Sequence, residues 1–157
     1  MRTAVDLNDL VSAIGDAIVV CDVSGKITLW NKAAERLFGH TEDEALGSSL
    51  DLMIPERMRE RHWDGYEKTM ETGVTRYGSD VLQVPAIDKS GRQFSIAFTV
   101  ALLHSADNKV SGIAALIRDD TKRFEKDRIQ RKRIAELEAM VARTADYASD
   151  RPPAGKT

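Results

Sequence analysis

The sequence has a single cysteine, few prolines and few aromatic residues, and it has no long apolar run. Because Cys21 stands alone, an intrachain disulfide and a cysteine-rich metal site are both excluded. No apolar run approaches the roughly 20 residues that span a bilayer, and the N-terminal acids interrupt any signal-peptide core. The net charge of −2 gives no electrostatic reason for nucleic-acid binding. We therefore expect a soluble, cytoplasmic protein with neither membrane nor nucleic acid as partner.

Signatures of catalysis are missing as well. The chain contains no glycine-rich phosphate loop, no nucleophile elbow and no metal-binding helix motif. Its 157 residues leave no room for a kinase or cyclase domain beside one domain of ordinary size. We therefore expect no enzymatic activity. The chain is either free-standing or a fragment of a longer signalling protein, and the frayed end PPAGKT favours the free-standing case.

The local patterns predict an α+β domain. AIVVCD and ITLWN, joined by the turn residues VSGK, predict a β-hairpin over 17–31. TEDE begins with Thr41 and has the form of a capping box for a short helix, after a helical turn at 32–39. Apart from Gly65, which costs only about 1 kcal/mol, the stretch 56–72 contains no helix breaker before Gly73 and predicts the longest helix of the domain. Three extended segments complete a sheet with the helices on one side, namely 75–87, 92–103 and 110–119.

The sequence predicts a helix at each end of the chain, and the apolar side chains of both helices need an apolar partner surface. The stretch 3–15 has mostly helical apolar spacing and is expected to end at Gly15. The segment 121–146 lacks Gly and Pro, and its apolar residues at 3-4-3 spacing suit a coiled-coil seam: Ile134, Leu137, Val141 and Thr144. A homodimer through both helices is expected, with a helix lying back on its own domain as the alternative. We predict an N-terminal amphipathic helix over 1–15, a folded domain over 16–120, a coiled-coil helix over 121–146 and a disordered tail over 147–157.

Four strings resemble the PAS sensory family, and the match covers about residues 8–121: DVSGKITLWNKAAERLFGHTEDEALG, IPERMRERHWDGY, IDKSGRQFSIAFTV and VSGIAALIRDDTKR, whose end continues into the following helix. The resemblance implies a five-stranded antiparallel sheet with short helices on one face, followed by a signalling helix. It also implies a sensor and dimerisation module in signal transduction, which acts on a downstream protein that the sequence does not identify.

The string IPERMRERHWDGY is similar to the haem-binding, FixL-type subgroup of that family. In that subgroup a histidine seven residues after the proline is the axial iron ligand, and here His62 follows Pro55 by seven residues. The resemblance therefore implies haem b on His62 and the sensing of a diatomic gas or of redox state. The subgroup's distal arginine falls at Leu82, which has no hydrogen-bond donor.

The remaining pocket candidates follow from this alignment and from the sheet. The distal side of the pocket would be formed by Tyr77, Leu82, Phe98 and Val100. The adjoining wall would be formed by Ile113 and Leu116. Met70 is a candidate for the sixth ligand of the haem iron. Candidate contacts for the haem propionates are Arg59, Arg61, Lys68 and Arg76.

Other readings of the same pocket stay open. It could hold a small organic ligand or no ligand, in which case the protein acts as an interaction and dimerisation module. A photoreactive flavin is disfavoured because Cys21 lies in the first strand and not in the helix where that chemistry occurs.

Overall fold

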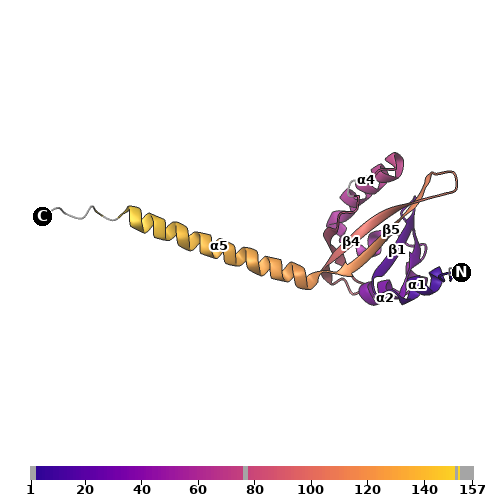
Figure 1. Cartoon of the computed structure of the whole chain (residues 1–157), viewed down its shortest axis with the longest axis horizontal. Helices are drawn as coiled ribbons and strands as arrows, with labels where there is room; N and C mark the ends of the chain where they lie inside the picture. The colour runs from indigo at the N-terminus through magenta and orange to yellow at the C-terminus, as the bar shows by residue number, and fades with distance from the viewer. Residues whose placement is uncertain (1–2, 76–77, 151, 153–157) are drawn as a thin grey trace. The chain divides into compact units, whose positions relative to one another are not determined.

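A five-stranded antiparallel sheet forms the centre of the first part of the chain (Figure 1). The computed structural model describes residues 3–75, 78–150 and 152. The strand order is β2-β1-β5-β4-β3, with β1 Ala17–Asp22, β2 Ile27–Trp30, β3 Leu82–Ile87, β4 Gln93–His104 and β5 Val110–Asp119. The predicted fold class and the first hairpin are confirmed. The segment predicted to be extended from residue 75 becomes a strand only at Leu82, after a turn at Gly78 and Ser79.

The helices also follow the local chemistry. They are α1 Leu7–Ala13, α2 Lys32–Phe38, α3 Glu42–Ala45, the 3-10 helix η1 Leu50–Met53, α4 Glu56–Thr72 and α5 Thr121–Ser149. The predicted bounds of α4 are confirmed. The first helix is shorter than its predicted range of 3–15. It starts after Asp6, whose carboxylate accepts hydrogen bonds from the backbone N–H groups of Asn8 and Asp9, and Ile14 is already extended.

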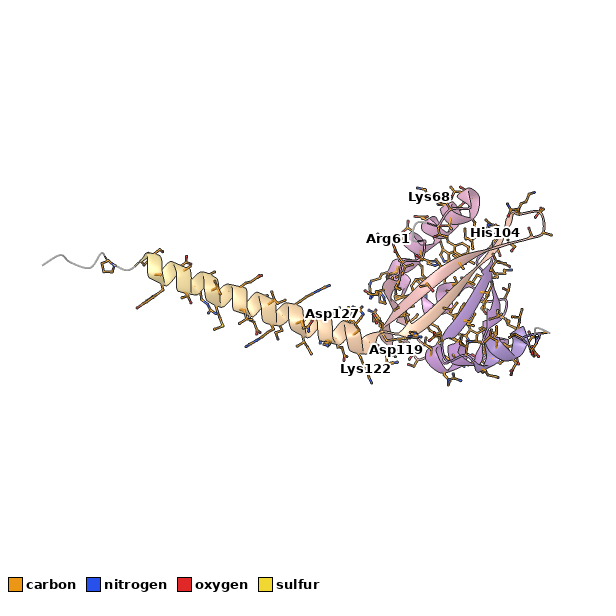
Figure 2. All side chains as sticks on the ribbon, in the orientation of Figure 1. Arg61, Lys68, His104, Asp119, Lys122 and Asp127 are labelled. Atoms are coloured by element: carbon orange, nitrogen blue, oxygen red, sulfur yellow. The ribbon has the colours of Figure 1, made fainter. Side chains whose placement is uncertain are left out.

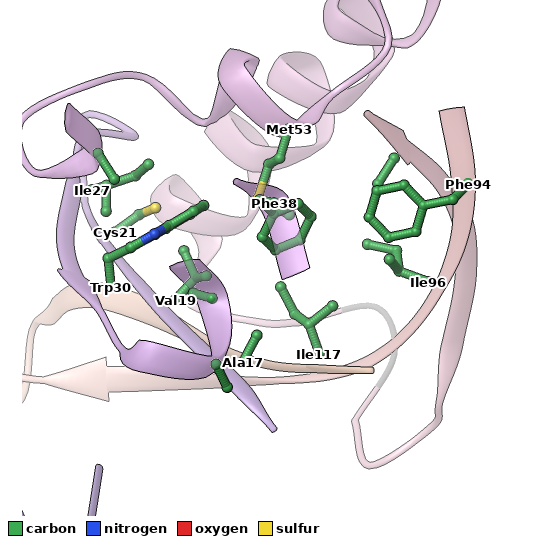
Figure 3. Close-up of a cluster of buried hydrophobic side chains, with 14 of the residues drawn as sticks. Ala17, Val19, Cys21, Ile27, Trp30, Phe38, Met53, Phe94, Ile96 and Ile117 are labelled. Carbon is green, nitrogen blue, oxygen red and sulfur yellow. The ribbon is translucent and has the colours of Figure 1, made fainter. Parts of the chain in front are cut away.

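The core lies between one face of the sheet and the helices (Figure 3). The Phe38 ring of α2 lies 5.4 Å from the Trp30 ring and 5.9 Å from the Phe94 ring, measured between centroids. Ile117 of β5 is buried in the same cluster. Burial raises the pKa of the Cys21 thiol to about 12, so this side chain packs as an unreactive apolar group.

A buried asparagine joins α1, β1 and α2. Asn31 is only 4% exposed and is the N-cap of α2. Its Oδ1 accepts hydrogen bonds from the N–H groups of Ala34 and Ile18, at 3.0 and 2.9 Å. Its Nδ2 donates to the carbonyls of Val11 and Asp16, both at 3.0 Å. One side chain therefore connects the end of α1, the start of β1 and the first turn of α2.

The chain divides into two compact units, residues 1–121 and 122–157. Within α5 no described side chain is buried, and the helix continues to Ser149 rather than ending at the predicted residue 146. The reason is that Tyr147 and Ala148 do not break a helix. Among the described residues, no helix combines the length and the apolar character needed to cross a bilayer.

Candidate functional site

α4 carries a group of three neighbouring rings, packed edge to face or tilted, on the face that is turned toward the sheet. The centroids of His62 and Trp63 lie 4.7 Å apart, those of Trp63 and Tyr66 5.3 Å, and those of His62 and Tyr66 6.0 Å. The Tyr66 hydroxyl donates a hydrogen bond to the backbone carbonyl of Asp22, at the end of β1. Since Tyr66 follows His62 by one helical turn, this bond fixes the rotation of α4 and places His62 near the sheet-facing side.

The His62 ring is half-buried, and its Nδ1 atom is buried without a hydrogen-bond partner. Burial lowers the pKa of His62 from its ordinary value of 6.5, and the charge of Asp51 opposes this shift only in part. The imidazole is therefore held neutral at pH 7, which is the form that binds metals. Buried polar atoms are nearly always paired, so the unpaired imidazole nitrogen is unusual for a side chain that only packs.

α4 follows the length of β4. Near its first turn the guanidinium of Arg57 donates to the Gln93 side chain at 2.8 Å, and at its other end Gly73 lies beside Val110. Among the described elements, α2 packs closely on β1, whereas α4 has no comparably close backbone packing with any strand. The backbone of α4 therefore lies farther from the strands than that of α2 does.

The sheet residues in this region are apolar and half-buried. They are Leu82, Phe98, Val100 and Ile113. Leu82 pairs with Phe98 across β3 and β4, so the two side chains share a face. In contrast, Phe94 and Ile96, near the start of β4, are fully buried. The structure thus brings four predicted pocket residues onto one apolar, half-buried surface.

Leu116 does not belong to that surface, and its predicted place in the pocket wall is wrong. Its backbone pairs with Ile18 and Thr99, and its side chain is 40% exposed on the outer face of the sheet. Ile113 and Leu116 are three residues apart in one strand, so the period of two puts them on opposite faces. The adjoining inward positions are Ala115 and Ile117.

The comparisons with known proteins agree with this architecture. The PAS fold matches residues 6–119. The chain belongs to the PAS family. Among solved structures, the PAS domain of a protein from Colwellia psychrerythraea has a TM-score of 0.64 and 23% identity. That similarity covers 73% of this chain and 94% of the other, and at this identity it bears on the fold alone.

Two curated relatives of this PAS domain are named as sensors. The sensor protein FixL of Bradyrhizobium diazoefficiens is 45% identical over 60 residues, which are 38% of this chain and 12% of that protein. The oxygen sensor protein DosP of Escherichia coli is 28% identical over 101 residues, which are 64% of this chain and 12% of that protein. The chain thus spans about an eighth of each relative's length.

The predicted basic residues of the PAS domain differ in their availability. Arg59 is already engaged, because its guanidinium donates to the carbonyls of Ile54 and Asp51 at 3.1 and 3.2 Å. Arg61 and Lys68 are exposed on α4 (Figure 2) and are free to turn toward a bound anion. Arg76 and Tyr77 lie outside the described residues, so their predicted roles stay predictions.

Met70 is half-buried and lines a groove with Trp63 and Tyr66, beside the turn between β1 and β2. Sequence reasoning missed the part of Asp51 in this region. Its carboxylate accepts a hydrogen bond of 2.7 Å from Trp63 Nε1, and its charge acts on His62. An acid in the 3-10 helix gives no sequence signal for either contact, since both depend on how η1 lies against α4.

Proposed function

We propose that this PAS domain is a signal-sensing module in which the imidazole of His62 is the axial ligand of a haem b. The observation that carries the proposal is the His62 imidazole, which is neutral and half-buried and has an unpaired buried nitrogen. It lies on a helix beside half-buried apolar residues of the sheet. The names of the relatives FixL and DosP, a sensor and an oxygen sensor, support the same role.

The side chains present fit a haem in their chemistry. A neutral imidazole is an axial ligand that iron accepts, and apolar side chains suit the faces of the macrocycle. Phe98, Val100 and Ile113 would supply those contacts, and Arg61 and Lys68 would supply cations for the propionates. Arg59 is not proposed for that role, because its guanidinium donates to the carbonyls of Ile54 and Asp51. When bound, a haem supplies an iron atom that binds a diatomic gas or changes its oxidation state.

The apolar side chain of Leu82 would then set the character of the distal wall. Leu82 pairs with Phe98, and neither side chain has a hydrogen-bond donor. These residues would exclude water from the pocket and discriminate ligands by size rather than by hydrogen bonding.

The route from this surface to the rest of the chain runs through the end of β5. The N–H of Asp120 donates to the carbonyl of Ser95 in β4 at 2.8 Å, and the N–H of Thr121 donates to the Asp119 carboxylate at 2.9 Å. A shift of β4 would therefore move the first residues of α5. In this proposal, ligand-dependent movement of the sheet biases the start of that helix, whose partner receives the signal.

The test is the visible absorption spectrum of the full chain, as purified and after addition of haemin. We expect a Soret band in the wild-type protein, and we expect His62→Ala to lose it or to shift it strongly, with haem affinity reduced at least tenfold. The matched control is His104→Ala, at the exposed end of β4, which should leave the spectrum unchanged.

Absence of a Soret band after reconstitution would reject the haem proposal, as would a spectrum that His62→Ala leaves unaltered. The PAS domain would then be interpreted as an interaction module, with an empty pocket or a small organic ligand. Thermal stabilisation by a tested organic ligand would separate these two readings.

The same protein is proposed to form a homodimer through α5 and the N-terminal helix. In α5, Ile134, Leu137 and Val141 are 55%, 45% and 69% exposed although they are large apolar residues at 3-4 spacing. In α1, Leu7 and Leu10 are exposed as well. A second copy of the chain that covers these side chains would remove them from water, which favours self-association.

Sedimentation equilibrium tests the dimer. Wild-type protein should sediment as a dimer, and Leu137→Lys should raise the dissociation constant at least tenfold by placing an unpaired charge in the seam. Ala139→Lys introduces the same charge two residues later, away from the 3-4 stripe, and should have little effect. A wild-type monomer at high concentration, or equal effects of the two variants, would reject the seam.

A further inference from the structure

The edge of α4 beside the β1–β2 turn carries an apolar groove that the haem contacts proposed above do not use. The groove has a volume of about 450 Å³ and runs between α4 and the β1–β2 turn. Its apolar lining comes from Trp63, Tyr66 and Met70, and its acidic lining from Glu67 and Glu71. It is open to solvent, so it suits a side chain presented by another protein better than an enclosed small molecule.

The rings that line the groove are held in place before any partner arrives. Trp63 Nε1 donates to the Asp51 carboxylate at 2.7 Å, and the Tyr66 hydroxyl donates to the Asp22 carbonyl. Because these bonds satisfy the polar atom of each ring, the surface left for a partner is the π system and the thioether of Met70. A surface fixed in this way loses little conformational entropy when it binds.

The charge along the groove is negative and uncompensated. α4 carries five exposed acidic side chains within an arc of roughly 80° on one side of the helix: Glu56, Glu60, Asp64, Glu67 and Glu71. None of them has an ion-pair or hydrogen-bond partner for its carboxylate in the described part of the chain. Like charges at i, i+4 spacing destabilise a helix, so a cationic partner would relieve a repulsion that the fold leaves in place.

We propose that this groove docks an arginine-bearing surface segment of a partner protein. A guanidinium stacks on the faces of tryptophan and tyrosine and at the same time forms paired hydrogen bonds with a carboxylate. Half-buried Trp63 supplies the face, since Tyr66 is only 9% exposed, and Glu67 and Glu71 supply the carboxylates at the edge. A lysine ammonium satisfies the charge but not the stacking, so arginine is the residue that uses both features.

Titration of the ¹⁵N-labelled full chain with a four-arginine peptide tests the proposal by NMR at 0.1 M salt. We expect the Trp63 indole N–H signal to shift. The Trp30 indole is buried and donates to the His40 carbonyl at 3.0 Å, so its signal should stay in place as an internal reference. A four-lysine peptide should bind at least threefold more weakly.

Glu67→Gln/Glu71→Gln should weaken arginine-peptide binding at least tenfold. The matched control is Glu56→Gln/Glu60→Gln, which makes the same change of charge at the same spacing on the same helix. These control residues lie about 10 to 16 Å before Glu67 along the axis, at or beyond the Debye length of about 10 Å, and should weaken binding less than twofold.

An unshifted Trp63 signal, equal losses in the two double variants, or equal binding of both peptides would overturn the proposal. Peptide-free shifts of Trp63 that depend on protein concentration would also overturn it, because the occupant would then be a second copy of this chain.

Discussion

Replacing Asn31 with alanine should lower the free energy of unfolding by about 3–5 kcal/mol, as measured by urea denaturation. The truncation removes four hydrogen bonds at once. It leaves the N–H groups of Ile18 and Ala34 without an acceptor, and the carbonyls of Val11 and Asp16 without a donor. The side chain is only 4% exposed, so water has little access to replace these partners.

Thr41→Ala is the control that separates the capping part of this loss from the rest. Thr41 caps α3 with one hydrogen bond to the N–H of Glu44, at 3.2 Å, in an exposed position. Its loss should cost about 1 kcal/mol or less. If Asn31→Ala destabilises no more than Thr41→Ala does, then Asn31 acts only as a cap and does not join α1 to β1.

The elements whose ends depend on nearby residues could be predicted from the sequence. The predicted N-cap at Thr41 is present, since its hydroxyl accepts from the Glu44 N–H. The Glu44 carboxylate accepts from the Thr41 hydroxyl, where a full capping box would have it accept from the Thr41 backbone N–H. α4 runs from Glu56 to Thr72 and ends at Gly73 because helix propensity and a left-handed C-cap agree there. Such signals lie within a few residues of each other, so tertiary context does not override them.

Two errors arose although the sequence contained the correcting signal. Ile113 and Leu116 cannot share a face of a strand, because side chains alternate with a period of two. Asp6 is a strong N-cap residue, and its presence shortens α1 at the start. In both cases the apolar character of the residues was given more weight than their spacing.

The contacts that shape the candidate site could not be predicted, because they join residues far apart in the chain. His62 was predicted from the resemblance to haem-binding PAS domains, but its unpaired Nδ1 and its neutrality follow from burial among Trp63 and Tyr66. The hydrogen bonds from Arg59 to the carbonyls of Asp51 and Ile54 likewise have no sequence signature. The groove on α4 depends on the same kind of contact.

The packing of Trp63 against Gly25 is the clearest such contact, and Gly25→Ala should destabilise the protein by about 2–5 kcal/mol. Gly25 has a φ of +83°, and a Cβ built there would overlap the Trp63 ring carbons Cζ3 and Cη2. The substitution therefore combines a left-handed conformation with a steric clash. Either the turn or the indole must move, and the indole is tied to Asp51.

The chain contains its own control for this substitution. Gly91 occupies the matching place in the second D-x-S-G-(K/R) turn, also has a φ of +83°, and has no atom within 4 Å of a built Cβ. In both turns the first aspartate accepts from the N–H groups two and four residues later. Gly91→Ala should therefore cost only the backbone part, about 1–2 kcal/mol.

A double-mutant cycle with Trp63→Leu isolates the contact between the turn and α4. With the indole removed, Gly25→Ala should cost no more than Gly91→Ala does, because only the left-handed backbone remains unfavourable. The coupling between positions 25 and 63 would then equal the steric part, about 1–3 kcal/mol. Equal costs for Gly25→Ala and Gly91→Ala in the wild-type background would show that α4 is not seated on this turn. In that case Tyr66 alone would have to hold His62 near the sheet.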